Sequence, residues 1–167
     1  MRYLVLFLLP NLALFLQSTL FSAYSIKGII PDLVLVFVVF FAIFNGTRKG
    51  TIYGFACGLL EDLYVGRFIG INALSKAITA YIIGRLQGNV FKENLMVGVI
   101  GVLVSTIINS LFLIILSLPV TNLYLLDLNI IISIAFQCIY NVLLAAPIYV
   151  WYYNSSWNGF LKLTGER

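Results

Sequence analysis

Three ionisable side chains lie inside long apolar stretches of the sequence, and they are the residues best placed to do chemistry. Glu61 and Asp62 are adjacent, and Lys76 lies in the next apolar stretch. An unpaired charge in such a segment is costly, so we expect Lys76 to pair with Glu61 or Asp62. The pair could hold two helices in register, or a carboxylate could serve a proton or ion relay. Register is the favoured interpretation, because nothing else in the sequence supports a relay.

Glycines recur at every fourth position just before these acids. Gly50, Gly54 and Gly58 follow Gly46 at this spacing, and Asp62 continues the series. Residues four apart share one face of a helix, and a face of small residues lets another backbone pack closely. This glycine stripe (Gly50, Gly54 and Gly58) predicts either a groove for a partner's membrane helix or close packing within the chain. Both interpretations remain open.

Uncharged polar residues form two further stripes in the apolar stretches near the carboxyl end. Ser133, Gln137 and Asn141 share one spacing, and Ser105 and Asn109 form a similar pair. Such groups usually hydrogen-bond between helices in a membrane. Their alternative role is to line a polar cavity that holds a small solute. Interhelical hydrogen bonds are the favoured interpretation, because polar groups this sparse usually serve packing.

Catalytic patterns are lacking in the sequence. It contains no histidine, so a serine or cysteine nucleophile has no imidazole base and a metal has no imidazole ligand. Cys57 and Cys138 do not have zinc-site spacing, and no glycine-rich phosphate-binding loop occurs. We therefore expect no enzyme, no cofactor and no metal.

The composition indicates a membrane protein. The 167 residues are 62% hydrophobic and 10% charged, and the mean hydropathy is +1.05. No linker or low-complexity tract divides the chain, so residues 1–167 are expected to form one polytopic domain. The net charge of +4 does not indicate nucleic-acid binding, because the basic residues are scattered at segment ends. The first apolar stretch is too long for a typical signal peptide, so we interpret it as a membrane helix.

The apolar stretches predict an all-α bundle of six transmembrane helices. Pro10 and Pro147 are expected to bend the first and last of them, and Pro31 and Asp32 are typical of a helix start. Breakers separate the stretches at Asn45 and Gly46, Gly66 and Gly70, Gly88 and Asn89, and Pro119. The expected helices cover about Tyr3–Ala23, Ile30–Phe44, Gly50–Tyr64, Ile71–Leu86, Leu95–Leu118 and Leu128–Tyr153.

Basic residues predict the orientation of this bundle. With six crossings, Lys27 and Arg67 fall on one side of the membrane. The other side carries Arg2, Arg48, Lys49, Arg85, Lys92, Lys162 and Arg167. Because the loops on the cytoplasmic side of a membrane protein carry an excess of Lys and Arg, both termini are expected there. The aromatic tail that begins at Tyr152 and Tyr153 is expected to lie at the interface with the headgroups.

The segment from Pro31 to Gly84 resembles the MreD family of rod shape-determining membrane proteins. In that family a Pro-Asp start leads to a Gly-x-x-x-Gly-Leu-x-x-Asp core and then to Gly-x-x-Ala-Leu. The matching positions here are Pro31, Asp32, Gly54, Gly58, Leu59, Asp62, Gly70, Ala73 and Leu74. The resemblance covers about a third of the chain, and the remainder agrees in size and polytopic character.

The resemblance implies a non-catalytic scaffold in the bacterial inner membrane. Such a protein would bind the bitopic protein MreC and couple the actin-like MreB to the synthases of peptidoglycan in the cell-elongation complex. The family also looks like the six-helix solute-binding subunits of energy-coupling-factor vitamin transporters, which is the alternative function. Those subunits usually carry an Ala-x-x-x-Ala patch on the first helix, whereas Ala13 is followed here by Gln17. The absence of the patch favours the shape-determining role.

Overall fold

The computed structural model describes residues 2–25, 28–66, 68–86, 94–121 and 128–158. These residues form six α-helices, with a π-helical turn, η1 (Gln17–Phe21), directly after the first. The helices are α1 (Arg2–Leu16), α2 (Leu33–Asn45), α3 (Thr47–Val65), α4 (Ile71–Gly84), α5 (Leu95–Thr121) and α6 (Leu128–Asn158). The prediction of an all-helical protein is therefore confirmed.

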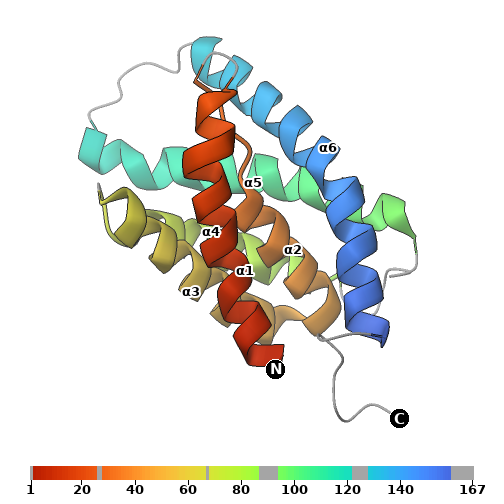
Figure 1. Ribbon diagram of the computed structural model, residues 1–167. Coiled ribbons are helices and arrows are strands. Elements are labelled where there is room, and N and C mark those ends of the chain that lie inside the picture. The colour runs from red at the N-terminus through yellow and green to blue at the C-terminus, as the bar shows by residue number, and fades with distance from the viewer. Residues whose placement is uncertain (1, 26–27, 67, 87–93, 122–127, 159–167) are drawn as a thin grey trace.

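Helix α2 lies at the centre of the bundle and contacts each of the other five α-helices. In Figure 1, α1 crosses in front of the bundle and α6 runs along one side. A helix that is apolar on every side is suited to burial on every side. Ten of the thirteen residues of α2 are buried, namely Leu33, Val34, Leu35, Val36, Val38, Val39, Phe40, Phe41, Ala42 and Ile43.

Local sequence sets the ends of the central helices. Asp32 caps α2, because its side chain accepts a hydrogen bond from the Leu35 N–H at 2.8 Å. Gly46, with φ of 84°, separates α2 from α3, and Gly66 ends α3 at φ of 68°. Gly70 precedes α4 at φ of 108°. Glycine adopts positive φ without steric strain, so these three glycines act as breakers where the sequence indicates, while Gly88 and Asn89 lie outside the described ranges.

Aromatic side chains join α6 to α2. Tyr149 and Tyr152 are each 2% exposed, and both rings pack against Phe40. Tyr152 also packs against Phe44, with ring centroids 5.4 Å apart. The ring of Tyr152 is thus part of the core, and the position of the tail at headgroup depth stays a prediction. Residues 159–167, on which the rest of that prediction depends, lie outside the described ranges.

Within the described ranges, three helical stretches are long and apolar enough to cross a membrane, namely Leu4–Phe21, Leu95–Leu118 and Asn129–Ser156. The shorter α2 is also apolar. Helix α5 continues to Thr121, so Pro119 does not end it as expected. A proline removes only its own N–H donor, and within the last turn of a helix the backbone can still keep helical geometry.

Candidate functional site

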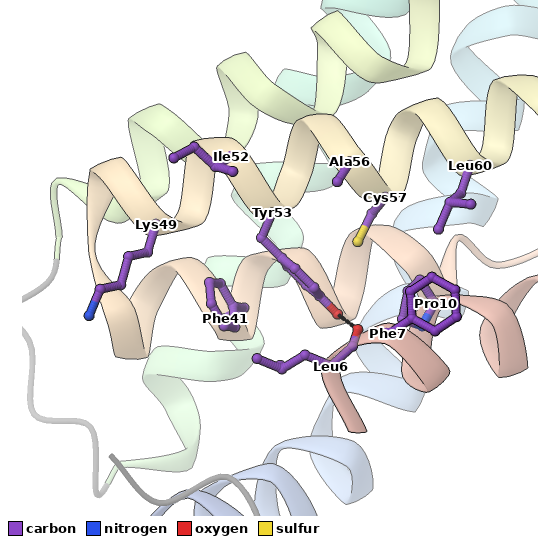
Figure 2. Close-up of a pocket in the computed structure, with 10 residues that line it drawn as sticks. All are labelled: Leu6, Phe7, Pro10, Phe41, Lys49, Ile52, Tyr53, Ala56, Cys57 and Leu60. Atoms are coloured by element: carbon purple, nitrogen blue, oxygen red, sulfur yellow. Dashed lines mark hydrogen bonds between the residues drawn. The ribbon is translucent and has the colours of Figure 1, made fainter. Parts of the chain in front are cut away.

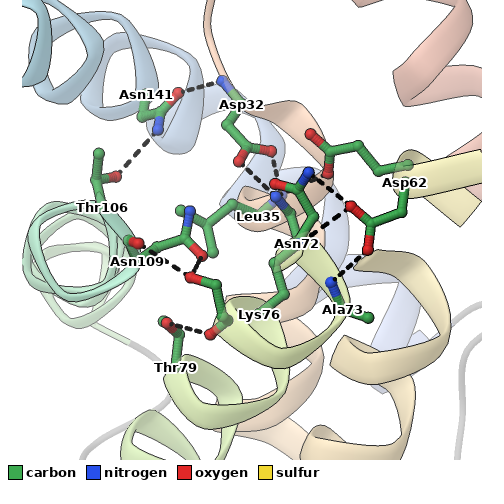
Figure 3. A network of polar contacts seen from close by, with 12 residues as sticks. Asp32, Leu35, Asp62, Asn72, Ala73, Lys76, Thr79, Thr106, Asn109 and Asn141 are labelled. Carbon is green, nitrogen blue, oxygen red and sulfur yellow. Dashed lines mark hydrogen bonds and ion pairs between the residues drawn. The ribbon is translucent and has the colours of Figure 1, made fainter. Parts of the chain in front are cut away.

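Lys76 forms the centre of a buried ionic cluster that joins three helices. Its side chain is fully buried, and its Nζ lies 2.7 Å from Asp32 Oδ2 and 2.7 Å from Glu61 Oε2. Lys76 belongs to α4 and Glu61 to α3, while Asp32 caps α2. Figure 3 shows the Lys76 side chain reaching toward Asp32. We call Asp32, Glu61 and Lys76 the ionic cluster.

The ionic cluster holds two carboxylates for one ammonium group. The side chains of Asp32 and Glu61 are 7% and 14% exposed, so solvent screens them little. Asp32 also faces the first backbone N–H groups of α2, where the helix dipole favours a negative charge. The Asp32 carboxylate therefore faces two sources of positive charge, the Lys76 ammonium group and the partial charge at the start of α2. Glu61 forms its ion pair with the same ammonium group of Lys76.

Asp62, although adjacent to Glu61, has a different role. Its carboxylate accepts hydrogen bonds from the backbone N–H groups of Gly70 at 2.8 Å, Asn72 at 3.1 Å and Ala73 at 3.0 Å. The Asn72 side chain donates a further bond at 2.9 Å, as Figure 3 shows. Asp62 thus caps α4 from the end of α3. Lys76 pairs with Glu61 rather than with Asp62, because the cap already directs both Asp62 oxygens toward the start of α4.

A neutral hydrogen-bond network continues from the ionic cluster to α5 and α6. Asn141 of α6 accepts a bond from the Asp32 N–H at 2.8 Å and donates one to Thr106 Oγ1 of α5 at 3.0 Å. Ser75 of α4 donates to Asn109 Oδ1 of α5 at 2.7 Å. These contacts have the interhelical character expected for Asn109 and Asn141. The polar side chains near the ionic cluster therefore connect α2, α4, α5 and α6.

The other residues of the two polar stripes lie elsewhere. Ser105 donates to the Val102 carbonyl within its own helix. Ser133 and Gln137 line an open cavity of about 730 Å³ between α5, α6 and the segment before α2. Ser110 and Asn129 also line it. The lining is mostly apolar and includes these four polar side chains, and the volume falls in the range of small-molecule sites, which is roughly 300–1,000 Å³.

The glycine stripe lies inside the bundle. A Cβ atom added to Gly54 would lie 2.8 Å from the Lys76 carbonyl oxygen, and one added to Gly58 would lie 2.6 Å from the Ala73 Cα. At Gly50 the nearest atom would be the Ala42 Cβ, at 2.8 Å. The backbone of α4 and a small residue of α2 therefore occupy the face that a partner's helix would need. This close approach also brings Lys76 within reach of α3.

Asp32 is the member of the ionic cluster that the sequence did not indicate as a partner for Lys76. Its position after Pro31 predicted a helix start, and this role is confirmed by the cap at Leu35. The same carboxylate uses its second oxygen for Lys76. A sequence signal did exist, because a carboxylate at the end of an apolar helix also needs a partner.

The charged groups of this region are directed at other parts of the same chain. Lys76 is enclosed by its two carboxylates, and Asp62 is directed to backbone N–H groups. In the part of the chain that the structure describes, no three His, Cys, Asp or Glu side chains gather as a metal site requires. The geometry of these groups is that of a polar core joining helices.

Comparison with known proteins agrees with the resemblance found in the sequence. The family model for rod shape-determining protein MreD matches residues 1–155 of the 167-residue chain. The match extends well beyond the segment from Pro31 to Gly84 and includes all of α1 to α5 and most of α6. Neither the search of curated proteins nor that of solved structures gave a match.

Proposed function

The chain belongs to the MreD family of rod shape-determining proteins, and from this we propose that it is a non-catalytic scaffold of the bacterial cell-elongation complex. The family assigns it a role in rod shape determination. We propose that it resides in the inner membrane and binds the bitopic protein MreC. Through MreC it would couple the actin-like MreB to the peptidoglycan synthases.

The observation that supports this proposal is that the buried charged groups all bind other groups of the same chain. Asp32, Glu61 and Lys76 pair with one another, and Asp62 caps a helix. A relay or a catalytic site needs an ionisable group that meets substrate or water, whereas these groups meet other parts of the same chain. Their arrangement supports a rigid bundle whose outer surface recognises partners.

We propose that residues 1–167 form one domain that crosses the membrane six times, with both termini in the cytoplasm. Helix α2 has 13 residues and is therefore about 20 Å long at 1.5 Å per residue. The hydrocarbon core is about 30 Å thick, so the bilayer would thin around the central helices. The adjacent basic residues Arg48 and Lys49 at the start of α3 support a cytoplasmic position for that end.

Cysteine labelling tests this orientation. In a background without Cys57 and Cys138, single cysteines at Arg48 and at Ile69 should react with an impermeant maleimide from opposite sides of the membrane. Both positions are exposed, at the start of α3 and just before α4 respectively. Reaction of both from the same side would contradict the proposed six crossings.

We propose that the glycine stripe serves helix packing and that MreC binds elsewhere on the surface. The stripe is filled by α4 and by Ala42 of α2. A partner's membrane helix could reach it only if α4 moved away, which would also separate Lys76 from Glu61. The surface available to a partner in the closed bundle is therefore outside the stripe.

Affinity capture tests the proposed partner. The tagged full chain, extracted in a mild detergent, should retain MreC and a peptidoglycan synthase. Capture from cells in which MreC carries an unrelated membrane helix is the matched control, because it separates binding within the membrane from binding outside it. Recovery of an ABC-type ATPase pair without MreC would overturn the proposal.

The cavity beside α5 and α6 supports a second candidate function. Its volume of about 730 Å³ and its polar residues Ser133 and Gln137 suit a small solute, as in the solute-binding subunit of an energy-coupling-factor transporter. Such a subunit would be stabilised against heat by its solute, and Gln137→Leu would abolish that stabilisation. Failure of a panel of water-soluble vitamins to raise the melting temperature would argue against this candidate.

A further inference from the structure

A groove between α1 and α3 has a volume of about 430 Å³ and lies apart from the ionic cluster. Figure 2 shows the side chains of both helices, with Phe41 of α2, along this groove. Most of the lining is apolar. The lining residues are Leu6, Phe7, Pro10, Phe41, Lys49, Ile52, Tyr53, Ala56, Cys57 and Leu60.

The polar atoms in the middle of the groove are already engaged or buried. The Tyr53 hydroxyl donates a hydrogen bond to the Leu6 carbonyl at 2.9 Å, as the dashed line in Figure 2 shows. Cys57 is 2% exposed and behaves as a small hydrophobic residue. A polar solute would therefore find few partners there, whereas a hydrocarbon chain would match the walls.

One end of the groove carries a positive charge. Lys49 lies at the end opposite Leu60 and Pro10 (Figure 2), and its side chain is exposed. Among the described residues, the ion pairs are made by Lys76, so Lys49 has no carboxylate partner there. An exposed lysine at the end of an apolar groove is complementary to an anionic headgroup whose chain lies in the groove.

The length of the groove matches one leaflet. Lys49 and Leu60 are both on α3, and their separation corresponds to about 16 Å along the helix axis at 1.5 Å per residue. Half of a hydrocarbon core about 30 Å thick is about 15 Å. A lipid whose phosphate contacts Lys49 would therefore place the end of its chain near Leu60, close to the middle of the bilayer.

We propose that this groove binds one anionic phospholipid, with an acyl chain against Tyr53 and Ala56 and the phosphate at Lys49. The site does not depend on MreC or on any solute. It differs from the general lipid surface in pairing an apolar groove of leaflet depth with a cation at its headgroup end. Lipids that merely surround the protein would show no such preference for charge at one place.

Photocrosslinking of the full chain in lipid nanodiscs tests the site. The probes are phosphatidylglycerol and phosphatidylcholine that carry a photoreactive acyl chain, and mass spectrometry locates the products. Phosphatidylglycerol should label peptides containing Ile52 and Ala56 more than phosphatidylcholine does. Lys49→Gln should lower phosphatidylglycerol labelling about fivefold, since one lysine near an anionic lipid contributes about that factor.

Matched variants separate specific binding from general lipid contact. Arg48→Gln removes an adjacent exposed charge that does not line the groove, and it should leave the labelling unchanged. Ala56→Trp should fill the groove and block labelling, whereas Phe55→Trp, on the same helix outside the groove, should not. Equal effects of the two charge variants, or equal labelling by both lipids, would overturn the proposal. The proposal would also be overturned if the labelling yield were unchanged in Lys49→Gln. Loss of labelling only when MreC is bound would overturn it as well.

Discussion

The Tyr53 hydroxyl donates a hydrogen bond to the backbone carbonyl of Leu6 at 2.9 Å. In a helix, the Leu6 carbonyl would accept from the N–H of residue 10, but residue 10 is proline and has no N–H. Tyr53 thus supplies from α3 the donor that α1 lacks. The bond explains how a proline can be placed inside an apolar helix, because neighbouring side chains can satisfy the carbonyl that it leaves free.

Tyr53→Phe should destabilise the protein by about 1–3 kcal/mol, because it leaves a buried carbonyl without a donor. The loss should be much smaller in a Pro10→Ala background, where the N–H of residue 10 can bond to Leu6 again. Melting temperatures of the four proteins in this double-mutant cycle measure the coupling. Equal losses in the two backgrounds would show that the proline and the tyrosine act independently.

Lys76→Met should destabilise the bundle by about 3–5 kcal/mol, because two buried carboxylates would then face each other without a cation. Thermal unfolding in detergent or nanodiscs is the measurement. Lys49→Met is the control for removal of a lysine, since Lys49 is exposed and should lose little stability. A stable Lys76→Met protein would mean that the ionic cluster does not hold the helices together.

Asp62→Ala should cost about 1–2 kcal/mol and should speed hydrogen exchange at the first turn of α4, where three backbone N–H groups lose their acceptor. Asn72→Ala is the matched control. It removes one side-chain donor to Asp62 but keeps the backbone contacts, so the first turn should stay protected. Unchanged exchange in Asp62→Ala would contradict the capping role.

Gly58→Ala should destabilise the protein by about 1–3 kcal/mol, because the new Cβ would overlap the backbone of α4 at Ala73. The helices would have to separate, which would also stretch the pair between Lys76 and Glu61. Leu63→Phe adds volume at an exposed position of the same helix outside the groove, and its melting temperature should stay near that of the wild type. A wild-type melting temperature for Gly58→Ala would show that α3 and α4 leave room for a methyl group at this position.

The helices could be predicted from the sequence because the apolar stretches and their breakers are local signals. Pro31 with Asp32, and Gly46, Gly66 and Gly70, mark helix ends that the structure also has. The helix end predicted at Pro119 was wrong, since a proline in the last turn of a helix leaves the preceding turns intact. The family, too, could be recognised from residues in one third of the chain.

The candidate site could be predicted only in part, because its contacts are not local. The charges inside apolar stretches predicted that Lys76 pairs with Glu61 or Asp62, whereas the glycine stripe left open whether it packs within the chain or against a partner. The contact between Asp32 and Lys76 spans 44 residues and depends on how α2 enters the bundle. The cap by Asp62 depends on the path of the turn between α3 and α4, which no periodic pattern records.

We propose that the ionic cluster holds helices together and takes no part in transport or catalysis. A neutral triple variant, Asp32→Asn with Glu61→Gln and Lys76→Met, removes every charge of the cluster at once and leaves none unpaired. Replacing a complete buried ion pair is often neutral or stabilising, whereas removing one partner is not. The triple variant should therefore be more stable than Lys76→Met alone.

Cell shape in a strain that depends on this protein is the most direct test. We predict that the triple variant, once its folding has been verified by thermal unfolding, restores rod-shaped growth and retains MreC in affinity capture. Round cells that contain a folded and membrane-inserted triple variant would contradict the claim, because they would show that the charges themselves are needed for function.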